Sequence, residues 1–119
     1  MSETRLLDYL DHMQEAAGLA CSYVDGFSKA AFLEDKKTQQ AVILNIIVLG
    51  EAATKVLKDH EPFVDAHPQV PWRSMKGMRN RIAHGYFDIN LDVVWDTVTL
   101  ALPELLTQLP AVRRAAETG

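Results

Sequence analysis

Eight consecutive residues, Arg79–Tyr86, carry the side chains of this sequence that are best suited to chemistry. They include two guanidinium groups, one imidazole and one phenol beside a glycine. A guanidinium is a planar, permanently charged fork that matches phosphate oxygens, and an imidazole can accept and return a proton near neutral pH. The phenol of Tyr86 can donate, accept or be modified. This set suits phosphodiester chemistry without a metal, although the same segment could be only a polar helix end.

Helical spacing predicts that this segment closes a helix over residues 72–84. Residues five positions apart in a regular helix point about 140° apart, so Arg79 and His84 do not share one face. They can converge only if the helix terminates at His84, or if two copies of the chain bring their motifs together. Gly85 occupies a position where helices commonly end in a left-handed conformation, which supports the first arrangement. The second arrangement remains open.

Apolar residues at spacings of three and four predict three more long helices, over residues 4–24, 36–60 and 89–109. A short helical turn is expected after Ser28, and Pro103 should kink the last long helix. We expect all-α architecture, an antiparallel bundle of four to five helices. The expected domain boundaries are a single helical domain over residues 1–110, with an irregular connection over 61–71, and a loose C-terminal tail over 111–119 after Pro110.

The expected helix over residues 36–60 is apolar almost all round between Ala41 and Leu49, so it must be covered on more than one side. In a chain this small, a second copy of the protein could supply part of that cover. Gly50 has no side chain and would let another helix approach closely. Glu51 follows in an otherwise apolar stretch, so we expect it to pair with a base. The apolar run is too short to span a membrane, which indicates a soluble protein.

The composition describes a folded chain with an acidic balance. The chain has 119 residues, 48% of them hydrophobic, and a formal net charge of −4. This argues against broad, non-specific nucleic-acid binding, which needs a basic surface. Any RNA contact must come from a local patch, and one exists within nine residues: Arg73, Lys76, Arg79 and Arg81.

The numbers and positions of cysteine and histidine residues argue against an internal disulfide and against a metal site. The single cysteine, Cys21, permits no internal disulfide and fits a reducing cytosol. Three further histidines, His12, His60 and His67, have no metal-ligand spacing, so no metal site is expected.

The motif and its surroundings resemble the HEPN superfamily and, within it, the HepT-type ribonuclease toxins. The pattern of that group is Arg, four residues, His, one residue and Tyr, which is Arg79, His84 and Tyr86 here. Three further stretches look alike: Gly50-Glu51-Ala52-Ala53, Pro71-Trp72, and Tyr86-Phe87-Asp88 with Val94-Trp95. The resemblance covers roughly residues 5–109. The short motif alone is weak, whereas the order and spacing of all these segments are far more specific.

The resemblance implies a homodimer whose two motifs face a cleft at the interface. It implies metal-independent endoribonuclease activity with no cofactor, on RNA, with no DNA or membrane partner. It also implies a cytoplasmic toxin of a type VII-like toxin–antitoxin pair. The antitoxin would be a minimal nucleotidyltransferase that silences the toxin by AMP transfer to the motif tyrosine, Tyr86 here.

Roles for individual residues follow from the resemblance. Arg79 and His84 would be catalytic: Arg79 holds the phosphate, and His84 acts as general base or acid while a ribose 2′-OH attacks the adjacent phosphorus. Asn80 and Arg81 would bind the substrate. Adenylylation of Tyr86 would place a bulky, negative group where RNA must bind.

Each assignment has a structural alternative. Arg79 could pair with Glu51 between helices, alongside catalysis or instead of it. His84 could be only a cationic C-cap that favours the helix dipole. Tyr86 and Phe87 could be core aromatics.

Two other functions use the same residues. The chain could be a non-catalytic helical module that dimerises and binds a nucleotidyltransferase, which the acidic net charge favours slightly. It could also be a nucleotide-binding regulator, recognisable by mononucleotide binding without RNA turnover. The intact set of Arg79, His84 and Tyr86 favours the enzyme.

Overall fold

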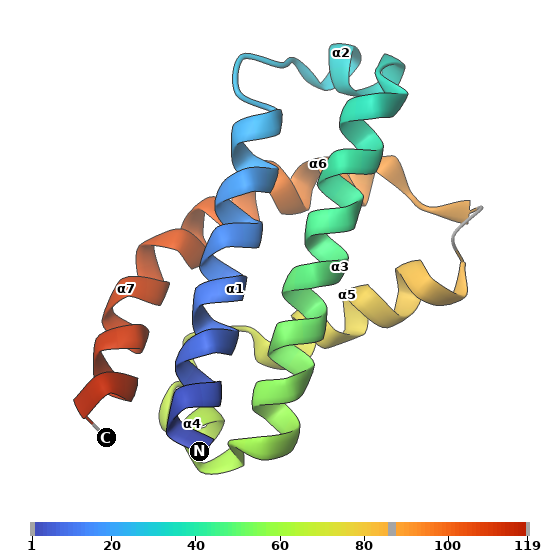
Figure 1. Ribbon diagram of the computed structural model, residues 1–119. Coiled ribbons are helices and arrows are strands. Elements are labelled where there is room, and N and C mark those ends of the chain that lie inside the picture. Colours follow the sequence, from blue (N-terminus) through green and yellow to red (C-terminus); the bar gives the residue numbers. More distant parts are fainter. Residues whose placement is uncertain (1, 86–87, 119) are drawn as a thin grey trace.

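The computed structural model describes residues 2–85 and 88–118, and every long element in this part of the chain is a helix. The elements in order are α1 (Ser2–Tyr23), α2 (Lys29–Glu34), α3 (Lys36–Asp59), α4 (Glu61–Ala66), α5 (Trp72–His84), α6 (Leu91–Asp96), the π-helical turn η2 (Thr97–Ala101) and α7 (Leu102–Thr118). Helices α1 and α3 run antiparallel, α5 crosses α3, and α7 packs along α1 (Figure 1). The predicted all-α bundle is confirmed.

Local capping fixes where several helices begin. The hydroxyl of Ser28 accepts a hydrogen bond from the Ala31 amide and starts α2. A carboxylate oxygen of Asp35 accepts one from the Thr38 amide and starts α3, and Asn90 caps α6 in the same way. Such caps satisfy amides that have no partner inside the helix.

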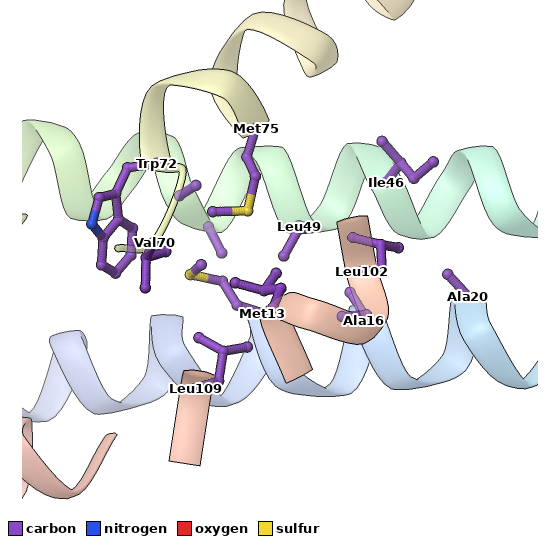
Figure 2. Packing of buried hydrophobic residues seen from close by; sticks show 14 of the residues in the cluster. Met13, Ala16, Ala20, Ile46, Leu49, Val70, Trp72, Met75, Leu102 and Leu109 are labelled. Atoms are coloured by element: carbon purple, nitrogen blue, oxygen red, sulfur yellow. The ribbon is translucent and has the colours of Figure 1, made fainter. Parts of the chain in front are cut away.

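The core lies between α1, α3, α5 and α7. Figure 2 shows Met13 of α1, Leu49 of α3, Met75 of α5 and Leu109 of α7 converging on one another. Each is buried. The indole of Trp72 closes this cluster near the start of α5, where its Nε1 donates to the carbonyl of His67 over 3.0 Å.

Helix α3 is the one helix in the described residues with the length and composition to cross a membrane. It is also the central core helix, because its Val42, Ile46 and Val56 side chains are fully or almost fully buried inside the bundle. Core helices of soluble proteins share this length and composition. The cover of α3 is incomplete, since Leu44 and Val48 remain 60% and 39% exposed.

Two expectations for irregular structure are wrong. Residues 61–66 form α4, because Pro62 occupies the first turn of that helix, where its missing amide costs nothing. The expected loose tail is helical: α7 continues through Pro110 to Thr118. A proline inside a helix costs about 3 kcal/mol, and this cost is offset because Val112 and Ala116 are buried beyond it.

A charged contact also anchors the end of α7. Arg113 donates to both carboxylate oxygens of Asp11 on α1 and pairs with Glu117 one turn further along. The hydrogen bond from Arg113 lowers the pKa of Asp11 below its ordinary value. The last helix is therefore tied to the first by both apolar packing and charge.

The expected kink at Pro103 takes the form of a π-helical turn. In η2 the Leu102 amide donates to the carbonyl of Thr97, five residues back, just before Pro103. Such turns and prolines are two standard causes of a bend in a helix. Together they redirect the chain from α6 to α7 (Figure 1).

Helices α3 and α5 approach each other closely at Gly50. A Cβ atom built on Gly50 would lie 2.9 Å from the carbonyl oxygen of Met75 and 3.1 Å from Cγ of Arg79, and closer still to Cβ of Arg79. Real Cβ atoms do not tolerate such contacts. The predicted close approach at Gly50 is therefore confirmed.

We expect Gly50→Ala to destabilise the fold by about 1–3 kcal/mol, because α5 must move away from α3 to accommodate one methyl group. Urea unfolding followed by circular dichroism measures this. Gly18→Ala is the matched control: a Cβ atom there meets nothing within 4 Å, so this change inside α1 should stabilise by about 0.5–1 kcal/mol. Equal stability of the two variants would contradict the assigned role of Gly50.

Candidate active site

The side chain of Arg79 is held at the crossing of α3 and α5. Its Nε lies 3.1 Å from Oε1 of Glu51, and its Nη2 donates to the hydroxyl of Thr54 over 3.3 Å. The Nε atom has no hydrogen-bond partner within the described chain, so the contact with Glu51 is an ion pair without hydrogen-bond geometry. The predicted pairing of Glu51 with a base is confirmed, and that base is Arg79.

Thr54 completes this support from α3. Its hydroxyl donates to the carbonyl of Gly50 over 2.7 Å and accepts from Arg79. The side chain of Arg79 is 24% exposed, so the guanidinium is fixed in direction and still reaches solvent. A fixed cation of this kind can hold a phosphate oxygen without reorganising.

His84 is exposed and is the last residue of α5. This end of the helix reaches an edge of the molecule (Figure 1). Asn80 lies four residues earlier, which places it within about 40° of His84 around the helix axis. These two side chains therefore share one face, and Asn80 stands between His84 and Arg79.

The expected left-handed ending at Gly85 is wrong. Gly85 has φ −119° and ψ 46°, and its amide still donates to the carbonyl of Arg81 as in a regular helix. Because α5 remains helical through His84, Arg79 and His84 point in different directions within one chain. The predicted termination of α5 at His84 is confirmed, but it does not place Arg79 and His84 on one face.

The predicted substrate-binding residues Asn80 and Arg81 lie on different faces of α5. Arg81 lines two mainly apolar cavities between α5 and the α6–α7 segment, with Met78 and Val93 among their walls. Asn80 lines a separate basic groove on the α3 side. The cations of the predicted basic patch therefore lie on different faces of α5: Arg73 and Lys76 line the groove, whereas Arg81 lines the apolar cavities.

This basic groove has a volume of about 650 Å³ and is lined by Thr54, Leu57 and Lys58 of α3 and by Arg73, Lys76 and Asn80 of α5. Two of these residues, Thr54 and Lys58, were not predicted as part of the site from the sequence. Their signal was the spacing Glu51, Thr54, Lys58, which places three polar side chains on one stripe of α3.

Tyr86 and Phe87 lie outside the described residues. Within the described residues, no group of three or more His, Cys, Asp or Glu side chains could hold a metal ion.

Comparison with known proteins identifies the family. The family model described as "HepT-like: Ribonuclease HepT-like" matches residues 13–112. A Methanocaldococcus jannaschii protein named "Putative RNase" is 33% identical over 94% of this chain and 87% of its own length. A Thermococcus cleftensis protein named "Probable ribonuclease HepT" is 36% identical over 90% of this chain and 94% of its own length.

No solved structure matches this chain. The matched region nevertheless contains the whole α3–α5 crossing, with Glu51, Arg79 and His84. The chain belongs to the HepT-like ribonuclease family.

Proposed function

We propose that this protein is a metal-independent endoribonuclease. The observation that carries the proposal is the guanidinium of Arg79, fixed by Glu51 and Thr54 yet open to solvent, with Asn80 and the exposed His84 on the adjoining face of α5. The names of the relatives support action on RNA.

In the proposed reaction, His84 accepts the proton of a ribose 2′-OH, and that oxygen forms a bond to the adjacent phosphorus. The bond from phosphorus to the 5′-oxygen breaks, and the leaving oxygen takes a proton from water, which the imidazolium of the same His84 then replaces. The products are a 2′,3′-cyclic phosphate and a 5′-hydroxyl. Arg79 offsets the charge that grows on the phosphate oxygens, and Asn80 orients the substrate or the imidazole.

We propose that the complete site forms in a homodimer. Within one chain Arg79 and His84 diverge, so a second copy is needed to bring a His84 beside each Arg79. A surface for it exists on α3, where the exposed Leu44 and Val48 lie on the same helical stripe as Glu51. A partner packed there would lie directly beside the Glu51–Arg79 pair.

The proposed biological role is that of a cytoplasmic toxin in a type VII-like toxin–antitoxin pair. Its partner would be a minimal nucleotidyltransferase that transfers AMP from ATP to the Tyr86 hydroxyl, with pyrophosphate as the leaving group. Tyr86 follows the exposed His84 by two residues. A bulky, negative adenylyl group there would compete with RNA for the cations of the site.

We expect the purified protein to cleave a labelled RNA in the presence of EDTA. His84→Ala should lower the rate by about 10²–10⁴-fold, because it removes the general base and acid. Arg79→Ala should lower it by about 10²–10³-fold, because it removes charge stabilisation. Gel analysis of the cleaved RNA measures both effects.

His12→Ala and Arg114→Ala are the matched controls, since both side chains are exposed and lie outside the site. They should cleave like the unaltered protein. Equal cleavage by all five proteins would identify a contaminating nuclease. No cleavage by the folded, unmodified protein would favour the non-catalytic binding module, for which the Arg79–Glu51 pair is only structural.

A mixture of the Arg79→Ala and His84→Ala proteins tests the composite site. If each site takes Arg79 from one copy and His84 from the other, half of the randomly mixed dimers regain one intact site of two. The expected rate is about a quarter of that of the unaltered protein. A mixture as inactive as its components would show that the two residues act from the same chain.

Co-expression with the cognate nucleotidyltransferase should add the mass of one or more AMP groups to the protein. Intact-mass spectrometry measures this, and Tyr86→Phe should abolish the gain. Tyr23→Phe, which alters an exposed tyrosine on α1, serves as the control. A mass equal to that of the bare chain would contradict silencing by AMP transfer.

A further inference from the structure

We propose that the basic groove between α3 and α5 binds the phosphate backbone of an RNA strand and leads that strand to His84. The inference deepens the proposed function and rests on it for the position of the cleaved phosphate. The groove would hold the nucleotides that flank the cleavage position. It would thus act on RNA binding and leave the bond-breaking step to Arg79 and His84.

The first support is charge. The groove carries three cations, Lys58, Arg73 and Lys76, in a protein whose formal net charge is −4. All three are exposed, and none has an acidic partner within ion-pair distance among the described residues. No acidic side chain of the described residues lines this groove. The groove is therefore a local positive surface available to an anion.

The second support is direction. Arg73, Lys76, Asn80 and His84 follow one another at spacings of three and four, so they form one continuous face of α5. A strand that lies along this face meets the cations first and the imidazole last. Thr54, on the opposite wall, accepts the hydrogen bond from Arg79, which joins the groove directly to the guanidinium.

The third support is length. From Arg73 to Asn80 the axis of α5 rises about 10 Å, which matches about three nucleotides of a stacked strand. Arg73 and Lys76 lie about 4.5 Å apart along this axis, Lys58 lines the facing wall, and the polar Asn80 follows beyond them. This elongated set of donors suits a repeating phosphate chain better than one compact anion. A single strand is also the form whose ribose can rotate so that its 2′-oxygen attacks in line, which cleavage requires.

The test measures binding of a fluorescein-labelled, single-stranded 2′-O-methyl RNA, which cannot be cleaved because its 2′-oxygen is blocked. Fluorescence anisotropy gives Kd at several salt concentrations. The groove variant replaces Lys58, Arg73 and Lys76 by Gln together. The matched control replaces Lys36, Lys37 and Arg114 by Gln, which are exposed cations outside the groove, so both variants lose three positive charges.

The groove variant should bind roughly tenfold more weakly at low salt, and the slope of log K against log salt should fall by about 2, because about 0.7 counterion is released per phosphate contact on a single strand. The control variant should retain most of the affinity and the slope. Equal losses in the two variants, or no loss in the groove variant, would overturn the inference.

Cleavage of unmodified RNA separates this inference from the proposed function. If RNA binds in the groove, the groove variant should have a higher KM than the unaltered protein and a kcat close to that of the unaltered protein. Cleavage with unchanged kcat/KM in the groove variant would overturn the groove and leave the nuclease standing. Selective loss of binding in a protein that never cleaves RNA would retain the groove as an RNA site and overturn the nuclease.

Discussion

The close crossing of α3 and α5 at Gly50 is the constraint on which the rest of the site depends. Because Gly50 lacks a Cβ atom, the stem of Arg79 can lie against the backbone of α3. At that separation the guanidinium contacts Glu51, the residue after Gly50, and Thr54, one turn further along α3. A packing requirement between two backbones therefore determines where the positive charge is held, and the groove opens beside the same crossing.

Helix α5 has three faces, and each face has different surroundings. One face is buried against α3, a second presents the cations of the groove, and a third, with Arg81, lines the apolar cavities toward α6. A regular helix separates such faces by fixed rotations. Four cations that are neighbours in the sequence consequently act in different places, which explains how an acidic protein presents a confined basic surface.

The sequence predicted what local patterns determine. The bounds of α5, the cap at Asn90 and the role of Gly50 follow from side-chain periodicity and backbone chemistry. The sequence did not predict the end of α7, because contacts between residues far apart in the chain determine it: α7 continues past Pro110, and Val112 packs into the core beside residues of other helices. It also failed to place Lys58 in the site, because only the crossing angle of two helices brings Lys58 beside Arg73.

The π-helical turn has a consequence for how the length of this chain can vary. In η2 the hydrogen bond spans five residues instead of four, so this turn holds one residue more than an α-helical turn. A regular α-helix over the same number of residues would instead rotate all that follows by about 100°. Val112 would leave the core and Arg113 would leave Asp11. The π-helical turn between Val94 and Leu102 thus accommodates one extra residue, and deleting that residue would leave the buried face of α7 in place.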